Sequence, residues 1–210
     1  MTPSDGEHLS MSIGLAMAGG DGRPFTARSI CQYGGEVQQW DVAVVPASFE
    51  WSSTHLISGR TESFDPATLS LIADGNAFRL TPDRIPGTFP DQVKLAFPLS
   101  LPIWGRPRDQ YHPVSVEDHD EGSVLLLRNS KDPGLFGSLT FDRTSGRAKR
   151  LATPSELLLM TVETPASSDD DKNSFGFISG APESAKYLNL FRAHADKQAR
   201  SKGGDIDADE

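Results

Sequence analysis

The sequence predicts a mainly β fold, a curved antiparallel sheet or half-barrel with an N-terminal and a C-terminal helix. Three observations lead to this prediction. Short segments rich in β-branched and aromatic residues recur along the chain, turn signals such as Gly34-Gly35 and Asp74-Gly75-Asn76 separate them, and no regular alternation of strands with helices is visible. A β-sandwich would give the same short strands and turns, so the pattern leaves sandwich and half-barrel open.

Two segments have the apolar periodicity of amphipathic helices. The first runs from Ser4 to Ala18 and ends at Gly19-Gly20, and its apolar positions are Leu9, Ile13, Ala16 and Met17. The second runs from Glu183 to Arg200, and its apolar stripe consists of Tyr187, Leu190, Phe191 and His194. We expect both helices to pack on the sheet.

The strands are expected in two blocks. The first block is an antiparallel meander with strands at residues 25–32, 36–45, 48–58, 69–73 and 77–80. The second block has strands at residues 123–128, 135–141, 147–151 and 156–163. Residues 156–163 are apolar on both faces, which fits either a central strand or a short buried helix.

A proline-rich connection links the two blocks. Residues 81–113 contain seven prolines, which exclude a long helix or a central strand, and only residues 91–96 fit a helical turn. The connection is too apolar for a disordered linker. We therefore expect an ordered segment that crosses one face or one edge of the sheet.

The apolar part of this connection, Phe97 to Pro113, is the candidate ligand-binding segment. The predicted ligand-binding residues are Phe97, Leu99, Leu101, Ile103, Trp104, Arg106, Arg108 and Tyr111. An indole beside two guanidinium groups can stack on a ligand or bind a carboxylate or phosphate. In the structural alternative, the apolar residues close the core and the arginines pair with Asp109 or Glu117.

Composition restricts the partners and the compartment. The net charge of −9 opposes binding to nucleic acid, and no stretch reaches the roughly 20 apolar residues that a membrane span needs. Cys31 is the single cysteine, which excludes an intramolecular disulfide and favours a buried, inert thiol. The chain after Met1 has no signal-peptide pattern, so we expect a cytoplasmic protein by default, with a processed exported domain as the alternative.

The chain is expected to form one β-rich domain over residues 1–200, followed by a disordered acidic tail at residues 201–210. No motif for catalysis or for a metal site stands out in it. The densest ionisable run, Glu117 to Glu121, is typical of a solvated turn, because successive side chains on a strand would point to opposite faces. We predict no catalytic residue, no metal and no cofactor. An enzyme whose catalytic residues come together only in the fold is the open alternative.

The order of the elements and one hairpin resemble a known family. The hairpin is Leu139-Thr-Phe-Asp142-Arg-Thr-Ser-Gly146-Arg-Ala-Lys-Arg-Leu151, and it follows a helix, an antiparallel meander and a proline-rich crossing. Over residues 5–163 this arrangement resembles the bacterial lipoprotein-carrier family and its actinobacterial relatives. The resemblance implies a strongly curved antiparallel sheet that wraps helices, with an apolar groove for acyl chains. No functional residue is transferred from it.

The preferred functional hypothesis is a soluble, non-catalytic binding module that presents an apolar groove to a lipid-like or other apolar ligand. The competing hypothesis is an acidic protein-interaction partner, such as an inhibitor or immunity-type protein, whose carboxylates meet a basic target. The expected partners are therefore an apolar small molecule or a protein, and not nucleic acid.

Overall fold

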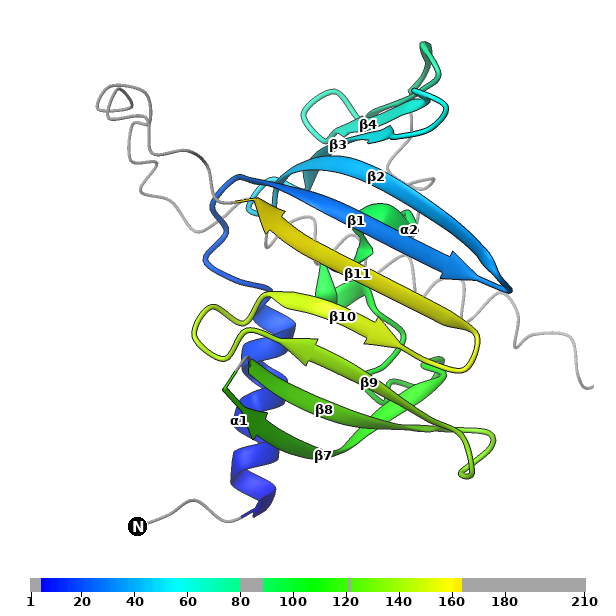
Figure 1. Ribbon diagram of the computed structural model, residues 1–210. Coiled ribbons are helices and arrows are strands. Elements are labelled where there is room, and N and C mark those ends of the chain that lie inside the picture. Colours follow the sequence, from blue (N-terminus) through cyan, green and yellow to red (C-terminus); the bar gives the residue numbers. More distant parts are fainter. Residues whose placement is uncertain (1–4, 80–88, 121, 164–210) are drawn as a thin grey trace, which may run out of the picture.

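The computed structural model of the protein describes residues 5–79, 89–120 and 122–163, which form an antiparallel sheet of eleven strands with helices on one face (Figure 1). The predicted fold class is confirmed as a mainly β fold with an open, curved sheet and an N-terminal helix. The predicted C-terminal helix and the predicted acidic tail lie outside the described residues.

After the helix α1 (Asp5–Ala18), the first half of the chain forms a meander. Its strands are β1 (Phe25–Tyr33), β2 (Glu36–Val45), β3 (Glu50–His55), β4 (Thr61–Asp65), β5 (Ser70–Ala73) and β6 (Asn76–Arg79). The predicted turns at Gly34-Gly35 and Asp74-Gly75 join β1 to β2 and β5 to β6, and all four residues have positive φ angles.

The second half starts with two short helices and continues with a second meander. The helices are α2 (Asp91–Lys94), at the predicted helical turn, and η2 (Pro98–Ser100). The strands are β7 (Tyr111–His119), β8 (Gly122–Asn129), β9 (Phe136–Phe141), β10 (Ala148–Ala152) and β11 (Glu156–Glu163).

The two meanders meet in the middle of the sheet. The strand order is β6-β5-β4-β3-β2-β1-β11-β10-β9-β8-β7, so β1 pairs with β11, with Thr26 opposite Glu163 and Tyr33 opposite Glu156. Residues 156–163 are thus a central strand and not a buried helix. Because β6 and β7 are the two edges, the chain between them has to run from one side of the sheet to the other.

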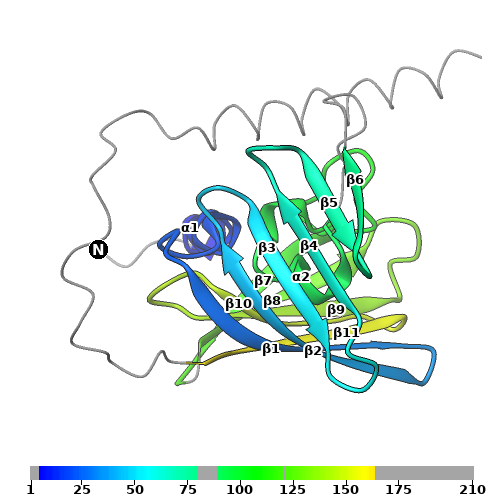
Figure 2. The ribbon, with the colours of Figure 1, turned by 90° about the horizontal axis from the view of Figure 1, so that it is seen from above.

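The sheet curves strongly, and its two faces differ. Figure 2 shows β1, β2 and β11 along the base of the view, while β3 to β6 turn upward and α1 and α2 lie inside the curve. We call the face that carries the helices the inner face and the opposite one the outer face. The described strands belong to one sheet, which corresponds to the half-barrel alternative and not to a sandwich.

The core lies on the inner face. The strand register aligns a row of leucines across its centre, each 0% exposed: Leu158, Leu151, Leu139 and Leu125. Cys31 continues this row on β1, where burial raises the pKa of its thiol to about 11. The predicted burial of this thiol is confirmed, and the thiol is protonated at neutral pH.

The helix α1 packs against β7, β8 and η2 through the predicted apolar stripe. Ala16 is 0% exposed, and Leu9 and Ile13 pack against the core. Gly19 ends the helix with a φ of 72°, and a Cβ there would lie 2.8 Å from Cδ of Pro98, so the chain needs glycine at this close approach. Within the described part of the chain, α1 and the other helices are too short or too polar to span a membrane.

Two strands were not predicted. In β4 the residues Thr61, Glu62 and Ser63 precede the one buried residue, Phe64, so the apolar alternation that signals a strand is missing. The prediction of a solvated turn at Glu117 to Glu121 is wrong for residues 117–119, which belong to β7. β7 tolerates charged residues and Pro113 because it is an edge strand, and the proline falls at a register shift against β8.

Gly146 lies where the β9–β10 turn contacts α1, so we expect Gly146→Ala to destabilise the fold. Its φ angle is 77°, and a Cβ would collide with the carbonyl oxygen of Leu15. Gly75 is the matched control, because its φ angle is 78° and a Cβ there would meet nothing within 4 Å.

Both variants should lose about 1–2 kcal/mol of unfolding free energy through the left-handed backbone. Gly146→Ala should lose about 1–3 kcal/mol more, because the added methyl group overpacks the contact with α1. Urea unfolding followed by tryptophan fluorescence measures both losses. Equal losses would contradict the close approach of the turn to α1.

Candidate functional site

The residues predicted to bind a ligand lie in the crossing, which we define as residues 89–110, and at the start of β7. α2 packs under β1, β2 and β3, and η2 packs on α1, so the crossing runs along the inner face (Figure 1). Four of the predicted side chains are buried in the core and at most 5% exposed: Phe97, Leu101, Ile103 and Tyr111. Leu99 and Trp104 are half-buried, and Arg106 and Arg108 are exposed.

Arg106 stabilises the crossing through contacts with other residues of the same segment. Its guanidinium Nε lies 2.9 Å from Oδ2 of Asp109, and Nη1 donates a hydrogen bond to the carbonyl oxygen of Leu99 at 3.0 Å. The indole Nε1 of Trp104 donates to the carbonyl oxygen of Pro98 at 2.8 Å. These contacts correspond to the structural alternative, in which the segment closes the core. Ligand binding by these side chains stays a prediction, and for the four buried ones it requires the crossing to leave the inner face.

A stack of three phenylalanines fastens the start of the crossing to the turn between β2 and β3. The ring centroids of Phe89 and Phe97 lie 3.9 Å apart, and that of Phe49 lies 5.7 Å from Phe97. Phe49 has a φ of 62°, so the strand predicted at residues 48–58 is interrupted there and β3 begins at Glu50. The aromatic side chain that breaks the strand thus anchors the crossing.

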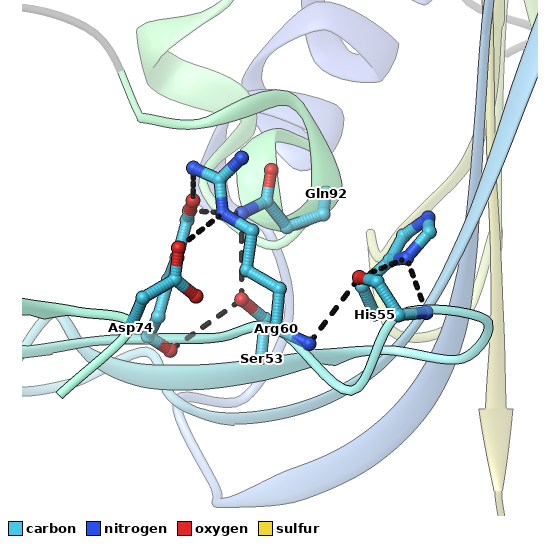
Figure 3. A network of polar contacts seen from close by, with 7 residues as sticks. Ser53, His55, Arg60, Asp74 and Gln92 are labelled. Atoms are coloured by element: carbon cyan, nitrogen blue, oxygen red, sulfur yellow. Dashed lines mark hydrogen bonds and ion pairs between the residues drawn. The ribbon is translucent and has the colours of Figure 1, made fainter.

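A polar cluster with a buried centre at Gln92 and Ser53 fastens α2 to the sheet (Figure 3). Gln92 is 6% exposed, and its Nε2 donates to Oγ of Ser53 at 3.3 Å and to Oε2 of Glu62 at 2.7 Å. Arg60 pairs with the other carboxylate oxygen of Glu62, and its Nε lies 3.4 Å from Oδ2 of Asp74. Because these groups have partners within the protein, the cluster stabilises the closed inner face.

A polar hollow of about 340 Å³ lies beside the end of β7, and two carboxylates in its lining, Asp118 and Asp142, stabilise the fold. One oxygen of Asp118 accepts a hydrogen bond from Ser123, and the other lies 3.2 Å from Nε2 of His8 on α1 and 3.4 Å from Nη1 of Arg143. In the described ranges, no group of three His, Cys, Asp or Glu side chains is placed to hold a metal ion. Asp118 therefore links α1 to the sheet.

Asp142, on the other side of this hollow, caps the turn between β9 and β10. Its Oδ1 accepts hydrogen bonds from the backbone N–H of Ser145 at 2.7 Å and of Thr144 at 3.0 Å, and Nζ of Lys149 lies 3.3 Å from Oδ2. These contacts, with the Ser145 N–H first, lower the pKa of the carboxyl to about 2. Asp142 is therefore ionised at neutral pH and belongs to the turn.

A second hollow, of about 400 Å³ and largely apolar, lies on the outer face over β1 to β4. We call it the outer hollow. A row of small side chains crosses its centre, and the register aligns its members Thr26, Ala43, Ser52 and Ser63 on four neighbouring strands. These residues alternate along the strands with buried core residues, which places them on the outer face.

Larger side chains border this row of small ones. On the side toward the end of β2, the residues that line the hollow are Pro24, Val45, Glu50 and Asp65. On the other side, the next outward pair is the Arg28–Asp41 ion pair, with Nη2 and Oδ1 3.0 Å apart. The hollow thus lies over small side chains, with larger ones along the border at the end of β2 and the Arg28–Asp41 pair on the other side over β1 and β2.

The lining carries negative charge. Glu50 is exposed, and Asp65 is half-buried at the end of β4. Asp65 accepts hydrogen bonds from Oγ1 of Thr68 at 2.7 Å and from the backbone N–H of Ala67 at 2.8 Å, and these contacts lower the pKa of its carboxyl. The rim of an apolar hollow is therefore anionic at neutral pH.

The outer hollow was not predicted from the sequence. Thr26, Ala43 and Ser52 are outward positions on three predicted strands, and nothing in their identity distinguishes them from ordinary solvent-facing residues. Only the strand register brings them into one row, and Ser63 completes the row on a strand that was not predicted. The available signal was the small size of outward residues on successive strands.

Comparison with known proteins gives similarity in fold only. No family model and no curated protein matches the sequence. Among solved structures, the crystal structure of MucB is 12% identical with a TM-score of 0.39, and the match covers 81% of this chain and 63% of MucB. The chain thus spans less than two thirds of the length of that protein.

Two further matches have a similar level of similarity. The LolA superfamily protein NE2245 from Nitrosomonas europaea is 9% identical with a TM-score of 0.32, and the match covers 78% of this chain and 93% of that one. An uncharacterized conserved protein from Thermus thermophilus is 9% identical with a TM-score of 0.37, over 76% of this chain and 86% of that one. The resemblance to the lipoprotein-carrier family is confirmed as a weak resemblance in fold.

Leu101 lies in the middle of the crossing and is 0% exposed. We therefore expect Leu101→Ala to lower the free energy of unfolding by about 2–5 kcal/mol. Leu126→Ala is the control, because Leu126 is 37% exposed on the outer face, and it should lose less than about 1 kcal/mol. Chemical unfolding measures both. A loss at Leu101 no larger than that at Leu126 would show that the crossing is not part of the core.

Asp142→Ala should remove stability at neutral pH and leave it unchanged in strong acid. The pKa of Asp142 in the folded protein is about 2, below the usual 3.8, so the carboxylate stabilises the fold above pH 3.8 and loses this effect as the pH falls through about 2. We expect a deficit of about 1–2 kcal/mol at pH 7. Unfolding at a series of pH values tests this, with the exposed Asp120→Ala as control. A deficit that does not change with pH would contradict it.

Proposed function

We propose that the protein is a non-catalytic binding module that holds an apolar group, from a lipid-like or another apolar ligand, in the outer hollow. The observation that carries this proposal is the hollow of about 400 Å³, largely apolar and open to solvent, on the outer face. Pockets that bind small ligands have volumes from about 300 Å³ upward and the same predominance of apolar surface.

The hollow is preformed, which favours binding. Behind its central row, the inward side chains of the same strands fill the core and are at most 9% exposed: Phe25, Val44, Trp51 and Phe64. Each of these four residues pairs directly with the next across the sheet. A ligand therefore meets strands that are fixed from behind, so little conformational freedom is lost on binding.

The expected affinity is modest. A group the size of an aromatic side chain buries about 150–250 Å², which corresponds to about 4–6 kcal/mol of apolar transfer free energy. The loss of translational and rotational freedom offsets much of this. The outer hollow is therefore suited to one apolar group, and further contacts around the rim would have to supply tight binding.

Two substitutions on β3 test the proposal. Ser52→Trp places a large side chain in the hollow, whereas Thr54→Trp places it two residues further along the same strand and the same face, outside the lining. We expect Ser52→Trp to weaken the binding of the neutral apolar dye N-phenyl-1-naphthylamine at least about tenfold, because it occupies the volume the dye needs. Thr54→Trp should leave the affinity unchanged.

The dye fluorescence measures binding, and circular dichroism checks that both variants fold. If the unchanged protein does not bind the dye, or if the two tryptophan variants affect binding equally, the outer hollow is not the site.

A further inference from the structure

We propose that the ligand of the outer hollow is a segment of a partner protein that presents an apolar side chain next to a lysine or arginine. This inference rests on the proposed function and adds the class of partner to it. Its basis is the charge around the hollow, which is negative on more than one side and is not neutralised by the described residues.

The acidic residues come from three strands. Glu50 lies opposite Val45 at the start of β3, and Asp65 at the end of β4 follows Phe64, which pairs with Trp51. Glu50 and Asp65 are therefore neighbours on the border of the hollow. Glu163, at the end of β11, lies opposite Thr26 and so adjoins the hollow from a third strand.

The basic residues near the hollow form ion pairs with other carboxylates. Arg23 lies with its Nε 3.5 Å from Asp21, and Arg28 pairs with Asp41 at 3.0 Å. In the described part of the chain, none of the ion pairs involves Glu50, Asp65 or Glu163. The donors to Asp65 are a hydroxyl group and an amide, which leave its charge in place.

An apolar hollow bordered by carboxylates favours a ligand group that is both apolar and cationic. A partner's apolar side chain can occupy the hollow, while an adjacent ammonium or guanidinium group lies against the carboxylates at the border. The apolar stem of lysine or arginine also covers apolar surface beside its charge. The same carboxylates repel the phosphate groups of anionic lipids, so charge favours a basic protein segment over such a lipid.

The effect of the charges is on selectivity and on the rate of association. Exposed ion pairs change affinity by up to about fivefold each and are screened by salt. We therefore expect the apolar side chain to provide most of the affinity, and the basic residue to distinguish one partner from another.

Four blocked peptides of about seven residues, differing only in the two central residues, test the inference on the full chain. The central pairs are Phe-Lys, Phe-Gln, Phe-Glu and Ala-Lys. Chemical-shift titrations by NMR give their dissociation constants, including millimolar ones. We expect Phe-Lys to bind about fivefold more tightly than Phe-Gln and about tenfold or more than Phe-Glu at low salt, and Ala-Lys to bind most weakly.

A variant pair locates the charge effect. Glu50→Gln should reduce the preference for Phe-Lys over Phe-Glu about two- to fivefold. Glu36→Gln is the control, because Glu36 is an exposed glutamate at the other end of β2, and it should leave the preference unchanged. A preference that does not depend on Glu50, or that persists in high salt, would overturn the role of the acidic border.

The outcomes separate this inference from the proposed function. If the three Phe peptides bind equally and more tightly than Ala-Lys, the hollow holds an apolar group but does not select a cation. If the neutral dye binds and none of the peptides does, the ligand is an apolar small molecule and the inference is wrong. If the dye does not bind, the proposed function itself fails, whatever the peptides do.

Discussion

The pairing of β1 with β11 determines most of this structure. It joins the first and the last described strands in the middle of the sheet, and so places β6 and β7 at opposite edges. With eleven strands spaced by about 4.8 Å, the path along the sheet between these edges is close to 50 Å. The chain between β6 and β7 has to join these two edges, and the crossing is the described part of that connection. It runs inside the curve, where its apolar side chains complete the core.

Because the crossing covers the inner face, the two faces of β1 to β4 meet different requirements. Inward positions have to fill the space under the crossing, and they carry large side chains such as Phe25 and Trp51. Outward positions are free of that requirement and carry Thr26, Ala43 and Ser52. A one-residue shift of register would exchange the two sets. The same pairing that builds the core therefore also builds the outer hollow.

The sequence was informative wherever local chemistry determines structure. The two-glycine turn at Gly34-Gly35 requires positive φ angles, and the strands on either side were predicted within a residue or two. Seven prolines and a high apolar content predicted an ordered connection across the sheet. Phe64 was not recognised as part of a strand, because a strand with one buried residue has no apolar periodicity of its own and forms only between its neighbours.

The candidate site could not be predicted in the same way. Phe97, Leu101 and Ile103 were predicted to bind a ligand because they are apolar in a segment whose prolines exclude a central strand. A curved sheet needs such a segment to close its core. The residues in the central row of the outer hollow are ordinary outward-facing residues. They form a hollow only because the strand register aligns them across four strands. An apolar run identifies what the fold buries, whereas this candidate binding surface depends on what the fold leaves open.

In the proposed binding site, charge matters more for selectivity than for affinity. Apolar burial at a small, open site gives a similar free energy for any side chain of the right size. Carboxylates at the border make these binding free energies differ. They favour a ligand with a cationic group next to its apolar side chain and disfavour one with an anionic group there. Asp65 suits this role because the turn at residues 65–68 already fixes its carboxylate and keeps it ionised. One residue thus ends β4, caps the following turn and adds negative charge at the border of the hollow.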